Sequence, residues 1–286
     1  MGCGRGYLVD ISFDNLDHAL LLKAVNKHTS NKWIILYITR WLKAPLQLQD
    51  GSLQERVCGL PQGGVISPVL SNLFLHYVFD VWMKTHYPTM PWCRYADDGL
   101  VHCKTQQQAR QLLAVLEQRF KQCGLELHPD KTRIIYCKDV KRKGTYLNTK
   151  FNFLGYCFRT RSVKNRANGK MFSSFTPAVS KEAQKSMRAK TRAMNLRNRT
   201  DLSLEQISEI CNPILRGWIA YYAKYCGSAL GFVLEHFNNT IVTWIMRKYA
   251  KFKGRKTMAR KLLVDIAKRK PSLFAHWKAG MGIGFA

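Results

Sequence analysis

The sequence of 286 residues is poor in acidic side chains. Its 18 Asp and Glu residues stand against 46 Lys and Arg residues, so the formal net charge is +28. Residues 1–150 hold 20 basic and 12 acidic residues, whereas residues 151–286 hold 26 and 6. Such an excess repels itself unless a polyanion is near, and nucleic acid is therefore the leading class of partner.

The sequence also lacks several other features that would define a class of protein. No C-x-x-C pair occurs among the nine cysteines, which argues against a structural zinc site or a disulfide framework. No run approaches the roughly 20 apolar residues that cross a membrane. The N-terminal residues are followed by no apolar stretch of a signal peptide, and Gly6 stands where N-myristoylation requires Ser or Thr. These absences predict a cytoplasmic protein, in a bacterial-type cytosol or on the nucleoid, with no membrane partner.

Two adjacent carboxylates, Asp97 and Asp98, lie within an apolar and aromatic stretch that begins at Trp92. β-preferring residues on both sides of the pair predict a hairpin whose turn exposes it. Neighbouring carboxylates repel each other and raise each other's pKa unless a cation is bound between them. Mg²⁺ takes oxygen ligands, usually one or two carboxylates, with water and phosphate oxygens completing its coordination. Acidic pairs also occur in ordinary polar turns, so both interpretations stay open for the pair alone.

The rest of the chain alternates strands and helices up to about residue 160 and is helical beyond it. A short strand carries Asp10, and the loop 58–66 leads to a helix that Ser67 is expected to cap, with Pro68 at its first position. Thr105 opens an amphipathic helix that ends at Gly124. Four later helices are predicted at residues 180–195, 203–225, 230–252 and 258–269. Their aromatic residues, Trp218, Tyr221, Tyr222 and Trp244, are expected to pack in the core rather than to stack on bases.

Several motifs in this order resemble the group II intron reverse transcriptase/maturase family. The matching stretches are residues 13–18, 59–68, 95–98, 124–132, 153–156 and 213–222. The resemblance implies an α+β fold, a right-hand polymerase palm with an antiparallel sheet backed by helices, followed by an all-helical thumb or maturase region. The expected domains are a palm at 1–160, a basic connector at 161–175 and the helical thumb/maturase domain at 176–286. The family's fingers and endonuclease parts are expected to be absent, which makes the palm N-terminally truncated.

The resemblance also implies a function. The expected activity is RNA-directed DNA synthesis by two-metal nucleotidyl transfer, together with a maturase role in binding and splicing intron RNA. The expected partners are an RNA template, intron RNA, a DNA primer and deoxynucleoside triphosphates, and a homodimer is left open. Two Mg²⁺ ions, for which Mn²⁺ could substitute, are the expected cofactors.

The same resemblance assigns roles to individual residues. The catalytic, metal-binding residues would be Asp10, Asp97 and Asp98. The nucleotide and template would contact Phe13, Pro61, Gln62, Gly63 and Lys131, and the end of the primer would be supported by Phe153, Leu154 and Gly155.

The first acidic motif departs from the family pattern. Six positions normally separate the catalytic Asp from the Asp of the Phe-Asp pair, whereas Asp10 and Asp14 are four apart. Two missing strand residues would move a side chain by roughly 6–7 Å without changing its face. Either Asp10 is the catalytic residue, or it corresponds to an acidic residue that precedes the catalytic one in the family and the ligand is absent.

Three further interpretations remain open. The chain could be a catalytically inactive, truncated fragment that acts only as a basic RNA-binding maturase-like protein. It could be a fragment that folds poorly and has no activity. The last is an RNA polymerase with a similar palm. Phe13 disfavours it, because the resemblance implies that this aromatic side chain lies beneath the sugar and excludes a 2′-hydroxyl.

Overall fold

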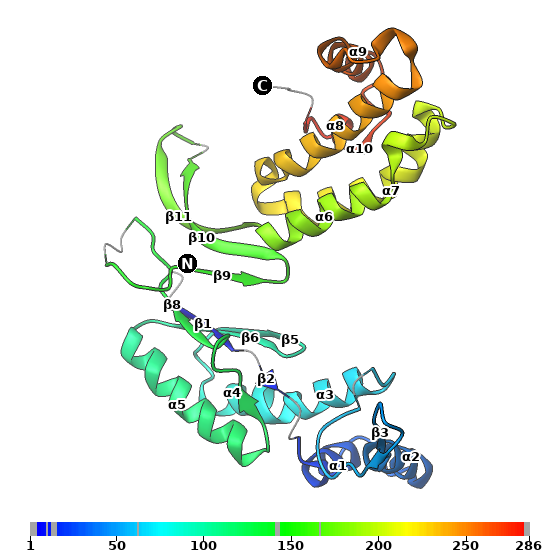
Figure 1. Cartoon of the computed structure of the whole chain (residues 1–286). Coiled ribbons are helices and arrows are strands. Elements are labelled where there is room, and N and C mark those ends of the chain that lie inside the picture. The colour runs from blue at the N-terminus through cyan, green and yellow to red at the C-terminus, as the bar shows by residue number, and fades with distance from the viewer. Residues whose placement is uncertain are drawn as a thin grey trace. The chain divides into compact units, whose positions relative to one another are not determined.

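A computed structural model describes residues 5–9, 11–12, 16–61, 63–140, 144–165 and 167–282. The chain forms two compact units, which are described separately (Figure 1). The first unit comprises residues 1–137 and 143–149, and the second comprises residues 138–142 and 150–286. No helix among the described residues is long and apolar enough to span a membrane.

A four-stranded antiparallel sheet forms the centre of the first unit. In spatial order its strands are β5 (Trp92–Tyr95), β6 (Asp98–Cys103), β1 (Arg5–Val9) and β8 (Arg133–Ile135). Side chains alternate between the two faces of a strand. In β6, Val101 and Cys103 are buried in the apolar core, whereas Asp98 and His102 are half-buried on the opposite face. The acidic residue therefore lies on the face of the sheet away from the core.

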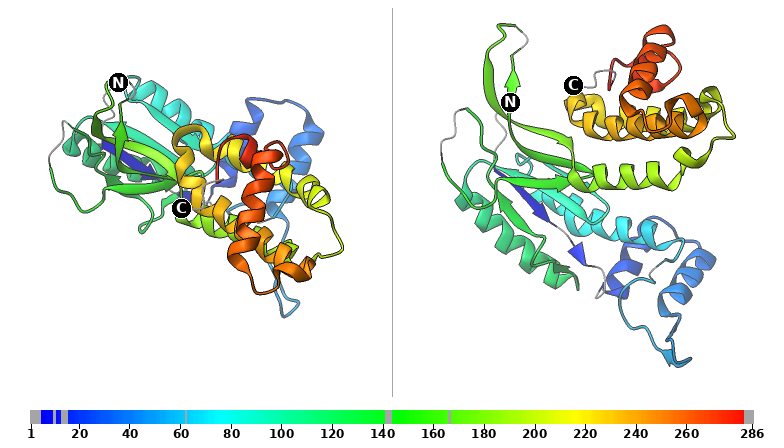
Figure 2. Two further views of the ribbon diagram at one scale, coloured as in Figure 1. Left: turned by 90° about the horizontal axis from the view of Figure 1, so that it is seen from above. Right: turned by 45° about the horizontal axis from the view of Figure 1, so that its top comes forward.

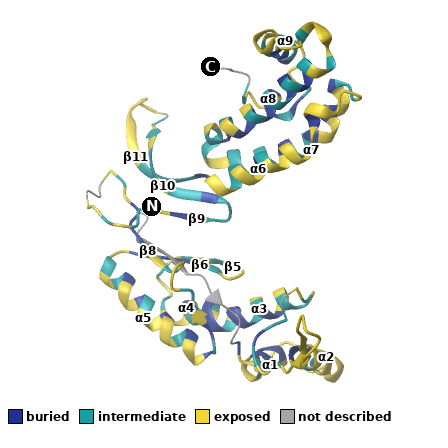
Figure 3. Cartoon of the chain, in the orientation of Figure 1, coloured by how far each residue is buried: buried dark blue, intermediate teal, exposed yellow. Residues whose placement is uncertain are grey.

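Helices cover the core face of this sheet. One continuous helical stretch consists of α3 (Ser67–Leu75), the π-helix η1 (His76–Val81) and α4 (Trp82–His86), and a second helix is α5 (Gln106–Gln122). Phe79 of the π-helix contacts Trp92 of β5 and Phe120 of α5, with ring centroids 5.3 and 6.3 Å apart. Figure 3 shows buried and exposed positions alternating around α5, as expected of an amphipathic helix.

The predicted limits of α5 are confirmed. The Thr105 hydroxyl accepts a hydrogen bond from the Gln108 N–H at 3.1 Å, which caps the first turn. Gly124, with φ of 71°, follows the last turn, where a left-handed conformation is favourable only for residues such as glycine. The remaining elements of the first unit are α1 (His18–Asn26), α2 (Lys32–Lys43) and the short strand pairs β3 (Leu46–Gln47) with β4 (Leu53–Gln54) and β2 (Ile11–Ser12) with β7 (Glu126–Leu127).

The second unit begins with a three-stranded antiparallel sheet. Its strands are β9 (Lys150–Phe153), β10 (Tyr156–Lys164) and β11 (Met171–Val179), with β10 in the centre. The sequence predicts a basic connector at 161–175, and most of these residues pair across a long β10–β11 hairpin, from Tyr156 opposite Val179 to Lys164 opposite Met171. Figure 1 and the right-hand view of Figure 2 show the tip of this hairpin standing clear of the helices of the same unit. The domain limits 1–160 and 176–286 stay predictions.

The remaining part of the second unit is helical, as predicted. The longer helices are α6 (Lys181–Ala193), α7 (Leu204–Cys226), α8 (Gly231–Lys248) and α9 (Lys256–Arg269), with the single-turn helix α10 (Ala275–Lys278) near the end. Ser203 and Gln206 form a capping box at the start of α7. Trp244 in α8 is 1% exposed, which confirms it as a core residue, whereas Tyr221 is 47% exposed. In the described part of this unit, short 3₁₀ segments connect the helices: η2 (Leu196–Asn198), η3 (Gly227–Leu230) and η4 (Ala250–Phe252).

A buried polar network ties α10 to α8. His276 is 0% exposed, and its Nε2 donates to Asn238 Oδ1 at 2.8 Å. The same oxygen accepts from Trp277 Nε1 at 3.3 Å, while Asn238 Nδ2 donates to the Gly282 carbonyl at 2.6 Å. His276 Nδ1 is buried and has no hydrogen-bond partner among the described residues. Protonation of Nδ1 would bury an uncompensated donor, and burial lowers the pKa of His276 from 6.5 to about 3.

This histidine should make the second unit sensitive to acid. Between about pH 6.5 and 3 the unfolded chain binds a proton that the folded unit does not bind, so stability rises with pH and falls on acidification. We expect a loss of about 2 kcal/mol from this group between pH 7 and pH 5, because each pKa unit corresponds to about 1.4 kcal/mol. Denaturant unfolding at the two pH values measures the loss. The His276→Gln variant keeps a donor toward Asn238, and its free energy of unfolding should fall by about 2 kcal/mol less between pH 7 and pH 5. An equal fall in the variant and the wild type would show that His276 is not the cause.

Candidate functional site

The predicted acidic hairpin is present. Strands β5 and β6 are joined by the two-residue turn Ala96–Asp97, so that Tyr95 pairs with Asp98. Asp97 is exposed at the tip of the turn, and Asp98 is half-buried at the start of β6. Ala96 has φ of 51°, a conformation that two-residue hairpin turns need and that glycine adopts more easily. Left-handed backbone at a non-glycine residue costs on the order of 1–2 kcal/mol, so neighbouring contacts must hold this turn.

Arg94 provides these contacts. Its Nε and Nη2 donate to the two carboxylate oxygens of Asp80 at 2.7 and 2.6 Å, and its Nη1 donates to Asn72 Oδ1 at 2.9 Å and to the Ala96 carbonyl at 2.8 Å. The Arg94 side chain is only 9% exposed. Asp80 lies in the π-helix η1, a distortion that is often found at functional sites. The planar guanidinium group thus fastens the acidic turn to the helices behind the sheet.

Loss of Arg94 should destabilise the first unit. The Arg94→Ala variant leaves the Asp80 carboxylate, which is 17% exposed, without this partner, and we expect the free energy of unfolding to fall by roughly 3 kcal/mol. Hydrogen exchange of amides in residues 92–103 measures this loss locally. The double variant Arg94→Met with Asp80→Leu should lose less, because it leaves no charge unpaired. If the free energy of unfolding falls by less than about 1 kcal/mol in Arg94→Ala, the Arg94–Asp80 pair contributes no more than an ordinary surface salt bridge.

Strand β1 lies next to the acidic strand. It runs antiparallel to β6, with Leu8 opposite Leu100 and Val9 opposite Gly99. The end of β1 is thus one ladder position from Asp98. The next residue of the chain, Asp10, and the aromatic residue Phe13 lie outside the described residues. Their predicted roles, and the meaning of the short spacing between Asp10 and Asp14, stay predictions.

The face of β6 away from the core is not uniformly polar. Leu100, which is 5% exposed, lies on it between Asp98 and His102. Burial lowers the pKa of His102 below its usual value, so the imidazole is held in the neutral form. Within the described residues, no three His, Cys, Asp or Glu side chains come close enough together to hold a metal ion. Asp97 and Asp98 supply carboxylate oxygens, the ligands that Mg²⁺ prefers.

Pro61, Gly63 and Gly64 lie just before the start of α3, and the Gly64 N–H donates to the Pro61 carbonyl at 3.3 Å. Gly63 has φ of 77°, and a Cβ atom on Gly64 would lie 2.7 Å from Ser67 Oγ. Gln62 lies outside the described residues. Ser67 was expected to cap α3, but its hydroxyl donates to the Pro61 carbonyl at 2.6 Å and makes no capping bond. This hydrogen bond holds Pro61 against the start of the helix.

The other predicted contact residues belong to different parts of the chain. Lys131 is exposed in the turn between β7 and β8 of the first unit. Phe153, Leu154 and Gly155 belong to the second unit, where Leu154 and Gly155 form the turn between β9 and β10 with φ of 50° and 77°.

Tyrosines of α7 hold this second turn. The hydroxyl of Tyr221 donates to the Leu154 carbonyl at 2.9 Å, and the Tyr156 hydroxyl donates to the Tyr221 carbonyl. A Cβ atom on Gly155 would lie 2.6 Å from the Tyr222 hydroxyl, so only glycine fits there without a shift. Burial, followed by the neighbouring tyrosines, raises the pKa of Tyr156. The sequence predicts Tyr221 and Tyr222 as core residues, and their contacts with this turn join residues 67 positions apart in the chain.

The fold and the acidic hairpin together define a class of protein: an α+β chain with an antiparallel, helix-backed sheet that carries paired carboxylates, followed by a helical region. The model of the family described as "Reverse transcriptase (RNA-dependent DNA polymerase)" matches residues 9–158, more than half of the chain. The model described as "Group II intron, maturase-specific domain" matches residues 184–263. The chain therefore belongs to the reverse transcriptase family, with a palm-type sheet in its first unit and a maturase-specific domain in its second. The predicted family and fold class are confirmed.

Individual relatives cover parts of the chain. Protein YkfC of Escherichia coli (strain K12) is 30% identical over an alignment of 163 residues, and the match covers 44% of this chain and 42% of that protein. Group II intron-encoded protein LtrA of Lactococcus lactis subsp. cremoris is 36% identical over 76 residues, 25% of this chain and 12% of that protein. The matched regions thus span less than half of either relative. Among solved structures, apo telomerase from Candida tropicalis aligns with 99% of this chain and 53% of its own, with a TM-score of 0.48 and 11% identity.

Proposed function

We propose that this chain is an RNA-directed DNA polymerase of the group II intron type, which extends a DNA primer on an RNA template and binds intron RNA. The observation that carries the proposal is the acidic turn, which Arg94 fastens to the helical layer while Asp97 stays exposed. A fixed and accessible carboxylate is suited to a reaction in which positioning and neutralisation of charge do most of the catalysis. In that reaction the primer 3′-hydroxyl attacks the α-phosphate of a deoxynucleoside triphosphate, and pyrophosphate leaves.

Members of the family generally use divalent metal ions. We propose that Asp97 and Asp98 hold two Mg²⁺ ions together with Asp10, and that Mn²⁺ can replace them. Bound ions would stabilise the charge on the attacking and leaving oxygens. The contribution of the chain is to hold the carboxylates in place. Asp98 is fixed by its position in the β5–β6 ladder, and Asp97 is fixed by the bond between Arg94 and the Ala96 carbonyl.

The proposed substrate contacts are those that the family resemblance implies. Phe13 would lie beneath the sugar of the incoming nucleotide and exclude a 2′-hydroxyl. Pro61, Gln62 and Gly63 would line the nucleotide and template, and Gly63 and Gly64 suit this role because a backbone without side chains lets a ligand approach closely. Lys131 would contact a phosphate. The turn of Phe153, Leu154 and Gly155, held by Tyr221, would support the primer end.

The second unit supports RNA binding as a candidate function that does not require polymerase activity. Residues 247–278 contain twelve Lys and Arg residues, and Asp265 is the single acidic residue among them. Such a density of positive charge is typical of a surface that contacts phosphates. A chain without polymerase activity would retain this function.

Primer extension on an RNA template with Mg²⁺ tests the proposal. We expect incorporation of deoxynucleotides in preference to ribonucleotides, and we expect no products when the metal is chelated. Binding of the same RNA is measured in parallel by filter retention. RNA binding without any incorporation would support only the RNA-binding function. Preference for ribonucleotides would favour an RNA polymerase.

A further inference from the structure

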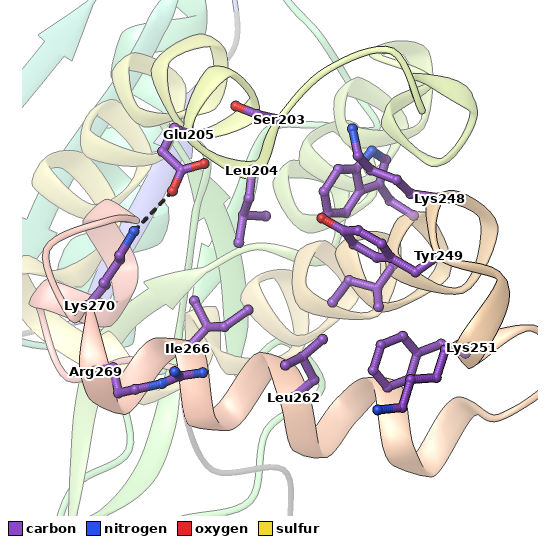
Figure 4. Close-up of a pocket in the computed structure, with 13 residues that line it drawn as sticks. Ser203, Leu204, Glu205, Lys248, Tyr249, Lys251, Leu262, Ile266, Arg269 and Lys270 are labelled. Carbon is purple, nitrogen blue, oxygen red and sulfur yellow. Dashed lines mark hydrogen bonds and ion pairs between the residues drawn. The ribbon is translucent and has the colours of Figure 1, made fainter.

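A pocket with no role in the proposed polymerase site lies among the helices of the second unit (Figure 4). It has a volume of about 510 Å³, within the roughly 300–1,000 Å³ that is common for ligand sites. The start of α7, the end of α8, η4 and one side of α9 line it. Every one of these elements belongs to the same compact unit.

The inner surface of the pocket is apolar and aromatic. Leu204, Trp244 and Ile245 line it and are buried. Figure 4 shows Leu262 and Ile266 of α9 pointing into it from one side. Tyr249, Phe252 and the start of α7 complete the wall. A hydrated phosphate or metal ion would gain nothing from this surface, whereas a flat, weakly polar ring would.

Tyr249 offers a ring held in one orientation. It follows the last residue of α8 in an extended conformation, with φ of −112° and ψ of 115°, which breaks the long helix that the sequence predicts over 230–252. Its ring packs edge to face with Trp244 and with Phe252, at centroid distances of 6.0 and 6.4 Å. The side chain is nevertheless 44% exposed. A ring that is fixed on one side and accessible on another is suited to stacking.

The rim of the pocket is positively charged. Four cations, Lys248, Lys251, Arg269 and Lys270, line it, together with one acid, Glu205. Lys270 Nζ lies 3.1 Å from Glu205 Oε1, which offsets one of these charges. Lys248 Nζ donates to the carbonyls of Thr200 and Leu202 at 3.0 and 2.6 Å, so its position is set by the fold.

The two remaining cations face the solvent. Lys251 and Arg269 are exposed. Because η4 and the end of α9 bring them to the rim of one pocket, they can attract the phosphates on either side of a nucleotide. An apolar peptide would not require these charges.

We propose that this pocket binds a single unpaired nucleotide of an RNA strand, with the base against Tyr249 and the apolar wall and its flanking phosphates on Lys251 and Arg269. The inference rests on the proposed RNA-binding function and adds a place and a class of ligand to it. Bases that are unpaired in loops and bulges can leave the helix and stack on aromatic side chains, whereas the bases of a duplex cannot reach such a pocket.

Two matched pairs of variants test the pocket. Tyr249→Ala removes the ring, and its control is Phe232→Ala, an aromatic residue of the same unit that is 70% exposed and does not line the pocket. Lys251→Glu reverses a rim charge, and its control is Lys253→Glu, an exposed residue two positions away that is not part of the lining. Circular dichroism and thermal unfolding check that each variant remains folded. The lysine pair changes exposed residues only and keeps the test valid if Tyr249→Ala unfolds.

Fluorescence anisotropy with a short single-stranded RNA, and with the same RNA annealed to its complement, provides the measurement. We expect Tyr249→Ala to weaken binding of the single strand by roughly 5- to 150-fold, the range found for loss of one base stack, and to leave duplex binding unchanged. Lys251→Glu and Lys253→Glu should weaken binding of both RNAs equally, because each removes one charge that attracts phosphates non-specifically. Lys251→Glu should weaken binding of the single strand further.

The outcomes separate this inference from the function on which it rests. If the wild-type chain binds RNA and the two pocket variants behave as their controls do, the pocket inference is wrong and RNA binding stands. An equal loss on single strand and duplex also overturns it, because the site would then bind phosphates only. If the wild-type chain binds neither RNA, both the proposed function and the pocket inference are wrong.

Discussion

Replacing Asp97 by Asn should reduce deoxynucleotide incorporation by about 10³-fold or more and leave RNA binding intact. The substitution keeps the size and shape of the side chain but removes the charge that we propose holds the metal ions. A metal ion contributes several kcal/mol of charge stabilisation in a transition state, and about 4 kcal/mol corresponds to a factor of roughly 10³ in rate. Asp97 is exposed at the tip of a turn, so the substitution should leave the fold of the chain unaffected.

Asp50→Asn is a suitable control for this prediction. Asp50 is an exposed residue next to Gly51 in the loop that joins strands β3 and β4 of the same unit, and the change of charge is the same. Single-turnover incorporation with saturating primer and template measures the chemical step. If Asp97→Asn and Asp50→Asn incorporate at the same rate, the acidic turn is not the catalytic centre. In that case the basic second unit alone would support a function.

Much of the fold could be predicted because its signals are local. The helix α5 has its cap, its apolar stripe and its terminal glycine within about twenty consecutive residues, and the structure has it at Gln106–Gln122. The acidic hairpin is similar, because β-preferring residues flank a short turn. The family resemblance then supplied the order of palm and helical region. The helix and the hairpin depend on residues that lie close together in the sequence, whereas the resemblance depends on the order of motifs between residues 13 and 222.

The features that could not be predicted from the sequence depend on contacts between residues that are distant in the chain. Arg94 is fourteen positions from Asp80, and nothing in the spacing shows that a π-helix turns this carboxylate toward the sheet. Residues 161–175 are rich in Arg, Lys and Asn and so resemble a loop, but cross-strand pairing stabilises them as a hairpin. Ser67 has the right type and place for a helix cap, yet the Pro61 carbonyl competes for its hydroxyl.

The candidate site divides in the same way. Asp97 and Asp98 were identified from their own neighbours and lie where a hairpin turn places them. The pocket around Tyr249 was not identified, because its lining comes from four segments between Ser203 and Lys270. Tyr249 itself was included in a predicted helix, and a single extended residue at that position is set by packing against Trp244 and Phe252. Aromatic content alone does not separate such a residue from the core.

RNA binding by this chain should weaken by roughly 10³- to 10⁵-fold between 50 and 200 mM salt, as for a protein that makes 6–10 phosphate contacts. The cause is the release of counterions when lysine and arginine side chains replace them at the phosphates. Residues 151–286 carry 26 basic and 6 acidic residues, so most of this dependence should come from the second unit. Affinities measured by anisotropy at several salt concentrations give the slope of log K against log salt.

Two triple variants locate the contacts. The first changes three exposed lysines of α9, Lys256, Lys261 and Lys268, to Gln. The second changes three exposed lysines on or beside the helices that back the sheet of the first unit, Lys84, Lys104 and Lys121. Each contact with a phosphate of single-stranded RNA contributes about 0.7 to the slope. The slope should therefore decrease by about 2 in the α9 variant and hardly change in the variant of the first unit, which is the control. Equal losses would mean that RNA is held by the net charge of the whole chain, without a defined surface on α9.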